Sequence, residues 1–330
     1  MSLTSCLADL HSPISQFLAG ALPSVAALAG HYRARLPLNP HTTRPVHDGP
    51  VSYRTLGQAI DLRLRTAIGA PVGSPVTSGI VLTTLTMANV QSPAAAAAVA
   101  GVGQQLVKEL NAHPPAAAGE LVLDQDEEER LARMCFVASW FEEVYRSGMR
   151  PSHPLLHADL AGGLDSVLEE VPDYVPADIA AQAALADQPT ALQWILHTPP
   201  DRRMCGPTFA GSHDVGGADA DLIVAGRLID CKATIRPKRI GRDQLYQLAG
   251  YLLLDYDDTY GIERVGLYLS RQGRLIEWDT DEFLSLLCAD RPLAQLREAC
   301  REALTADPSD ASGLVPRQAA FEQDALFGDL

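Results

Sequence analysis

The strongest constraint on the fold is a hairpin signal in the last third of the chain. Two short runs rich in β-branched and aliphatic residues, 220–224 and 228–234, are separated by only three residues. Alternate residues of a strand share one face of a sheet, so Asp230 and Lys232 point the same way, and Asp221 comes near Asp230 across the turn. The sequence therefore predicts two carboxylates and one ammonium group that converge at the edge of an otherwise apolar sheet.

Such a group favours metal chemistry on a phosphodiester. Two close carboxylates repel each other unless a cation neutralises them, and hard oxygen ligands suit Mg²⁺ or Mn²⁺. We expect Asp221, Asp230 and the backbone carbonyl of Cys231 to bind the ion, because the residue between two inward-facing side chains directs its carbonyl sideways. Lys232 would orient or deprotonate an attacking water and offset the developing negative charge. The alternative is a solvated edge hairpin with a cross-strand salt bridge.

The same residues resemble a known nuclease motif. Asp221 followed by Asp230-Cys231-Lys232 is similar to the motif of the PD-(D/E)xK phosphodiesterases, and Gln247 and Tyr251 resemble the QxxxY element of their RecB-like exonuclease branch. The likeness covers about residues 208–280. It implies an α/β fold with a restriction-endonuclease-like mixed β-sheet core flanked by helices. It also implies that Gln247 and Tyr251 border the metal site and the DNA.

The function that the resemblance implies is metal-dependent hydrolysis of DNA, in DNA repair, recombination or phage defence. Two alternatives remain open at this stage. The chain could keep the fold without the chemistry, as a nucleic-acid-binding or scaffold module of a larger repair or defence complex. It could also be a structural protein with a fortuitous hairpin, which would leave Gln247 and Tyr251 without an explanation.

Two further carboxylates are candidate metal ligands. RecB-like nucleases often carry a GxxxH helix whose histidine binds a second metal, and residues 57–61 have this spacing with Asp61 in the last position. Glu142 falls within the apolar face of a predicted helix, where a carboxylate must be paired, protonated or bound to metal. The alternative for both residues is an ordinary salt bridge at a helix edge.

The pattern divides the 330 residues into three parts. Residues 1–200 form a mostly helical N-terminal region that packs on the core, 201–290 form the nuclease core, and 291–330 form a helix and a mobile tail. Helices are expected at 53–68, 93–111, 124–146, 177–196, 242–255, 279–288 and 292–304, and further strands at 208–213, 264–270 and 274–278.

Charge is distributed unevenly along the chain. The net charge is −15, whereas phosphate binding requires basic surface. Residues 232–242 nevertheless hold five basic side chains and no acidic one. We expect this segment to contact the DNA backbone, although an ordinary solvated loop is the alternative. The residues expected to bind nucleic acid are Arg236, Lys238, Arg239 and Arg242.

The remaining features concern location and partners. The six cysteines are scattered without a CxxC pair, and no signal peptide or membrane helix is recognisable, so a reducing cytoplasm is expected. Near the end of the chain, Gln323, Leu326 and Phe327 resemble the QxxLF peptide by which bacterial repair proteins dock on the sliding clamp. The alternative is that these apolar residues pack back onto the body of the protein.

Overall fold

A five-stranded mixed sheet lies at the centre of the computed structural model, which describes residues 2–116 and 120–306. The strands follow one another in space as they do in sequence, and only β3 and β4 run parallel. A parallel pair needs a crossover, and helix α10 (Arg242–Leu254) provides it. The strands are β1 (Arg203–Cys205), β2 (Leu222–Val224), β3 (Arg227–Lys232), β4 (Arg264–Leu269) and β5 (Arg274–Asp279).

The predicted hairpin of β2 and β3 is present, with a turn one residue shorter than expected. Val224 pairs directly with Arg227, and both turn residues have positive φ, 50° at Ala225 and 79° at Gly226. A two-residue turn of this kind matches the natural twist of paired strands. Continuing the register by one pair beyond the end of β2 places Asp221 opposite Asp230.

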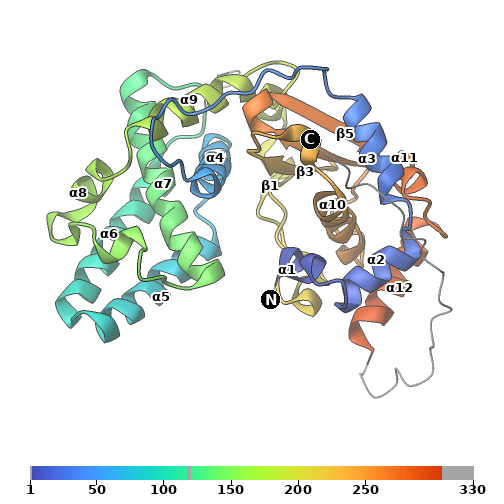
Figure 1. Cartoon of the computed structure of the whole chain (residues 1–330), viewed down its shortest axis with the longest axis horizontal. Helices are drawn as coiled ribbons and strands as arrows, with labels where there is room; N and C mark the ends of the chain where they lie inside the picture. The colour runs from blue at the N-terminus through green and yellow to red at the C-terminus, as the bar shows by residue number, and fades with distance from the viewer. Residues whose placement is uncertain (1, 117–119, 307–330) are drawn as a thin grey trace, which may run out of the picture.

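The two faces of the sheet lie in two separate hydrophobic cores. Leu222 and Ile229 on one face join the core formed with α4 to α9, whereas Ile223 and Leu228 on the other face join a core with α1 to α3 and α10 to α12. Figure 1 shows these two groups of helices on opposite sides of the strands. The first group is α4 (Tyr53–Ala67), α5 (Ser74–Val90), α6 (Pro93–Ala112), α7 (Gln125–Ser147), α8 (Gly163–Glu169) and α9 (Tyr174–Ala186). The second is α1 (Leu3–Ala8), α2 (Pro13–Ala21), α3 (Val25–Ala34), α10, α11 (Thr280–Leu286) and α12 (Leu293–Thr305).

The first three helices therefore lie far from the rest of the N-terminal part. They pack on α10 and α12, and the amide of Leu3 donates a hydrogen bond of 2.8 Å to the carbonyl of Gly217. The chain then crosses to the other side of the sheet before α4 begins. Helices from both ends of the sequence thus cover the same face of the sheet.

Most predicted helices are confirmed to within a few residues, and their first turns show why. The side chain of Ser92 accepts a hydrogen bond from the amide of Ala95 and begins α6. The carboxylate of Asp124 accepts two amide hydrogen bonds at the start of α7. Such caps satisfy amides that have no partner within the helix.

Two element predictions were wrong. Residues 208–213 do not form a strand: Thr208 makes only an isolated bridge to Asp219, and the Ser212 hydroxyl closes the loop by bonding to the Phe209 amide and the Ala218 carbonyl. The sheet edge is instead β1. The helix expected at 177–196 ends at Ala186, and a separate 3₁₀ turn follows at Gln193–His197.

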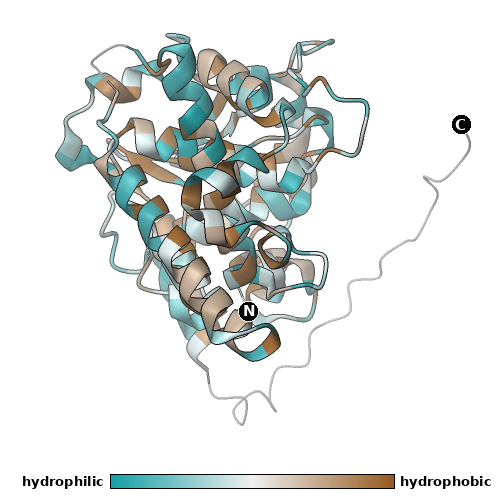
Figure 2. Cartoon of the chain, turned by 90° about the vertical axis from the view of Figure 1, so that its left-hand side faces the viewer, coloured by the Kyte–Doolittle hydropathy of each residue, from teal (hydrophilic) through white to brown (hydrophobic). Residues whose placement is uncertain are grey.

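The outer helix α5 is unusual for a protein with so many acidic residues. It contains no charged residue, and Val81, Leu82 and Leu85 are exposed on it. Figure 2 views the chain from the side of α4 to α9, where hydrophilic and hydrophobic segments alternate along the ribbons.

Among the described residues no single helix is long and apolar enough to cross a membrane. Helices α2 and α3 together, bent by 76°, reach that length and composition.

Candidate metal and nuclease site

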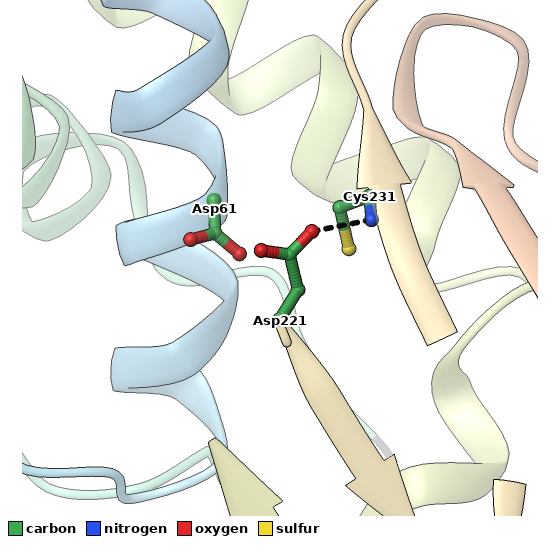
Figure 3. A group of neighbouring side chains, drawn as sticks. All are labelled: Asp61, Asp221 and Cys231. Carbon is green, nitrogen blue, oxygen red and sulfur yellow. Dashed lines mark hydrogen bonds between the residues drawn. The ribbon is translucent and has the colours of Figure 1, made fainter. Parts of the chain in front are cut away.

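Asp221 lies immediately before β2, where it meets helix α4. Its Oδ2 accepts a hydrogen bond of 2.6 Å from the backbone amide of Cys231, and its Oδ1 accepts one of 3.1 Å from Nη2 of Arg65. The same nitrogen lies 2.7 Å from Oδ2 of Asp61, one helical turn earlier. Figure 3 shows the carboxylates of Asp61 and Asp221 facing each other, with Cys231 beside them on β3.

The geometry of α4 brings Asp61 to this point. Gly57 lies one turn before Asp61, and a Cβ built on it would sit 3.6 Å from the side chain of Ala233, just beyond β3. The buried residues Leu56 and Ile60 hold the helix against the first core. Residues four apart share a helix face, so Asp61 and Arg65 both point toward the hairpin. The spacing of the GxxxH element is therefore present, with a carboxylate at the histidine position.

Asp230 and Lys232 lie on the other side of the hairpin, toward α10. The ammonium group of Lys232 lies 2.7 Å from Oδ2 of Asp230 and donates a hydrogen bond of 3.0 Å to Oε1 of Gln247. The amide nitrogen of Gln247 in turn donates a hydrogen bond of 2.7 Å to the hydroxyl of Tyr251, whose ring stacks on Phe209. The structure thus brings the two sequence motifs together in one continuous polar chain.

Burial changes the acidity of this group. It raises the pKa of Asp61 to about 8, against a partly compensating effect of Arg65, and raises that of Asp230 to about 6. Burial alone would lower the pKa of Lys232, but the carboxylates of Asp230 and Asp221 together outweigh it and raise that pKa, so the ammonium group stays protonated. Burial also raises the pKa of Tyr251 well above its usual value, which keeps the phenol neutral.

Glu142 joins the cluster from α7. Its carboxylate lies 2.6 Å from Nε of Arg146, and Arg146 also lies 3.2 Å from the carboxylate of Asp219. The expected helix-edge salt bridge of Glu142 is therefore present, and its charge also acts on Asp61. Asp61 likewise makes a salt bridge, with Arg65, four residues along the helix.

The charged side chains around Asp61 and Asp221 form a cluster with more negative than positive groups. It contains the five carboxylates of Asp61, Glu142, Asp219, Asp221 and Asp230, against the three cations Arg65, Arg146 and Lys232. With every group ionised, two negative charges remain. Oδ1 of Asp61 is buried and has no hydrogen-bond partner among the described residues. Both observations fit a divalent cation with oxygen ligands, because it would neutralise the excess charge and bind the free oxygen.

Cys231 lies beside the carboxylates of Asp61 and Asp221. Its thiol, a carboxylate oxygen of Asp61 and one of Asp221 all lie within 4.8 Å of one another, so its side chain faces the cluster. Burial raises the pKa of this thiol well above its usual value. The backbone carbonyl of Cys231 stays the predicted ligand. The position of its thiol was not predictable, because strand alternation does not tell which face of the sheet meets α4.

The predicted basic segment is only partly free. Lys238 donates a hydrogen bond to the carbonyl of Leu38, and Arg242 donates one to the carbonyl of Leu7 and lies over the ring of Tyr246. Arg236 and Arg239 are exposed and have no side-chain partner among the described residues. Two of the four side chains thus hold the N-terminal part of the chain in place.

The most important residue that the sequence did not indicate is Arg65. It follows Asp61 at the spacing of a helical ion pair, so its proximity to that carboxylate was recognisable. Its contact with Asp221 depends on the packing of α4 against the hairpin and has no sequence signal.

The expected clamp-binding residues Gln323, Leu326 and Phe327 lie outside the described part of the chain.

No protein-family model matches the chain, and no curated protein or solved structure is significantly similar to it. Functional assignment therefore depends on the geometry and chemistry of the site.

Proposed function

We propose that this chain is a divalent-metal-dependent nuclease that hydrolyses DNA phosphodiester bonds, with a PD-(D/E)xK centre in a restriction-endonuclease-like core. The observation that carries the proposal is the polar chain from Asp230 through Lys232 and Gln247 to Tyr251. These residues come from two separate sequence motifs, and a fortuitous hairpin gives no reason for them to meet. The order hairpin, helix α10, parallel strand β4 and antiparallel strand β5 supports the same assignment.

The proposed metal is Mg²⁺ or Mn²⁺, held by Asp221 together with Asp61 and Asp230. Their oxygen donors, their excess negative charge and the free Oδ1 of Asp61 fit such an ion. When bound, it would polarise the scissile phosphate and make a water molecule more acidic. Glu142 lies at the edge of this set, because Arg146 already binds its carboxylate.

Lys232 has an electrostatic role in this proposal. Because the carboxylates of Asp230 and Asp221 raise its pKa, Lys232 stays protonated, and its ammonium group is a hydrogen-bond donor and not a base. A charged donor beside the scissile phosphate stabilises the negative charge that develops on its oxygens in the transition state. Gln247 fixes the direction of the ammonium group by accepting one of its hydrogens, and Tyr251 fixes Gln247 in turn.

The substrate is expected to approach along the segment after β3. Arg236 and Arg239 carry exposed guanidinium groups within seven residues of Lys232 in sequence. Guanidinium groups bind phosphate oxygens without reading base identity, so this surface suits backbone contact. The remaining acidic surface would repel DNA and make binding weak.

The alternative function is an inactive module that binds nucleic acid without cutting it. One observation favours it: Arg65 already places a positive charge between two of the carboxylates. An arginine fixed permanently in this position would replace the metal and leave no chemistry.

A cleavage assay separates the two functions. Purified protein is incubated with linear, circular and single-stranded DNA, with Mn²⁺, with Mg²⁺ or with chelator. We expect metal-dependent cleavage that Lys232→Ala and Asp221→Asn abolish, while Asp173→Asn, at a fully exposed carboxylate, cuts normally. Binding of DNA without cleavage would establish the inactive module, and full activity of either site variant would overturn the assignment of the centre.

A further inference from the structure

Arg65 differs from the buried arginines Arg63 and Arg271 in how its ion pairs are made. Arg63, two residues earlier, uses Nε and Nη2 to bind both oxygens of Glu128, and Nη2 also reaches a backbone carbonyl. Arg271 binds both oxygens of Asp178 through its two terminal nitrogens and donates from Nε to the carbonyl of Ala233. Paired donation from a planar guanidinium is the strong arrangement.

The side chain of Arg65 lacks this arrangement. One nitrogen, Nη2, contacts both Asp61 and Asp221. Its Nε is buried without a hydrogen-bond partner among the described residues. Oδ1 of Asp61 is also unpartnered. A buried donor and a buried acceptor both left unsatisfied make this ion pair poor in hydrogen bonds, although its charges are complementary.

Arg65 therefore interacts with the two carboxylates mainly through its positive charge, and not through paired hydrogen bonds to one of them. Its Nη2 bridges one oxygen of Asp61 and one of Asp221, the two oxygen ligands that come from different elements of the fold. A divalent ion between these two carboxylates would supply twice the charge without the geometric demands of a guanidinium. Because the ion and the Arg65 guanidinium would carry like charges between the same pair of carboxylates, their binding there is mutually exclusive.

We propose that Arg65 is a built-in competitor of the catalytic metal: its guanidinium bridges Asp61 and Asp221, and it must withdraw before an ion binds between these two carboxylates. This inference rests on the proposed nuclease function and extends it to the control of metal affinity. Any interaction that draws Arg65 away, such as one with a substrate phosphate, would tighten metal binding. Metal and substrate would then bind cooperatively.

The experiment measures Mn²⁺ binding directly, by the electron paramagnetic resonance signal of free Mn²⁺. The proteins are wild type, Arg65→Met, the matched control Arg63→Met, and Arg65→Met combined with Asp61→Asn. We expect Arg65→Met to bind Mn²⁺ at least tenfold more tightly than wild type and Arg63→Met to bind as wild type does. The gain should disappear in the double variant, because it depends on the freed carboxylate.

A second measurement covers the case in which Arg65→Met does not fold. In wild-type protein, the side-chain nitrogen resonances of buried arginines are followed by NMR during titration with Mg²⁺. We expect the Arg65 signal to shift as the ion binds, while those of Arg63 and Arg271 stay in place. The competition would be refuted if the Arg65 signal did not move at Mg²⁺ concentrations that displace Mn²⁺ from the protein in the binding experiment.

The possible outcomes distinguish a failure of the proposed competition from a failure of the proposed metal-dependent function. Equal or weaker Mn²⁺ affinity of a folded Arg65→Met variant, with wild type still binding the ion, overturns the competition alone. Failure of both wild type and Arg65→Met to bind millimolar Mn²⁺ overturns the metal site as well.

Discussion

Asp61→Asn should stabilise the metal-free protein, by an amount that grows with pH. Burial raises the pKa of Asp61 to about 8 from its usual value of 3.8. Between these values the folded protein holds a proton that the unfolded chain has released, so the stability of the wild type falls by up to about 1.4 kcal/mol per pH unit. The asparagine variant lacks this penalty. From pH 5 to pH 7 its stability relative to wild type should therefore rise by about 2 kcal/mol, which allows for the 19% exposure of the Asp61 side chain.

The assay is urea unfolding followed by tryptophan fluorescence in the presence of chelator, at pH 5, 6 and 7. Asp173→Asn serves as the control, because its fully exposed carboxylate should show no such trend. Adding Mn²⁺ should stabilise the wild type and leave Asp61→Asn unchanged. A stability difference between wild type and Asp61→Asn that is constant over this pH range, or that shrinks as the pH rises, would refute the reasoning about burial.

Two further predictions concern DNA contact and folding. Neutralising Arg236 and Arg239 together should reduce the slope of log affinity against log salt by about 1.8, since each phosphate contact contributes about 0.9; an unchanged slope in fluorescence-anisotropy titrations would move the DNA path elsewhere. Asp178→Asn should destabilise the protein by about 3 to 5 kcal/mol, because it leaves the fully buried Arg271 without its charge partner; chemical unfolding that shows a loss below 1 kcal/mol would contradict this.

The hairpin and the helices with strong caps could be predicted because local signals determine them. The apolar runs on either side of the turn fix β2 and β3, and Ser92 and Asp124 mark the beginnings of their helices. The failed strand at 208–213 shows where such signals mislead, since the Ser212 hydroxyl bonds to the backbone in place of a neighbouring strand.

The candidate site was predictable only in part, for a related reason. Strand alternation identified Asp230 and Lys232, which belong to one element, and the resemblance to the QxxxY element identified Gln247 and Tyr251. The meeting of Asp61 and Arg65 with Asp221 depends on long-range packing between α4 and the hairpin. No pattern within the sequence specifies how Arg65 and Asp221, which are 156 residues apart, approach each other.

Because the site lies between α4 and the β2–β3 hairpin, the proposed ion would also hold these two elements together. Asp61 belongs to a helix and Asp221 to the end of a strand, so an ion held by both is a cross-link between the helical layer and the sheet. It would bind only while the two are docked, and at a hundred times its dissociation constant it would add about 2.7 kcal/mol to their docking. Slight separation of the layers would dismantle the centre while both hydrophobic cores stay folded, so catalytic activity would be lost well before helical structure during gradual denaturation.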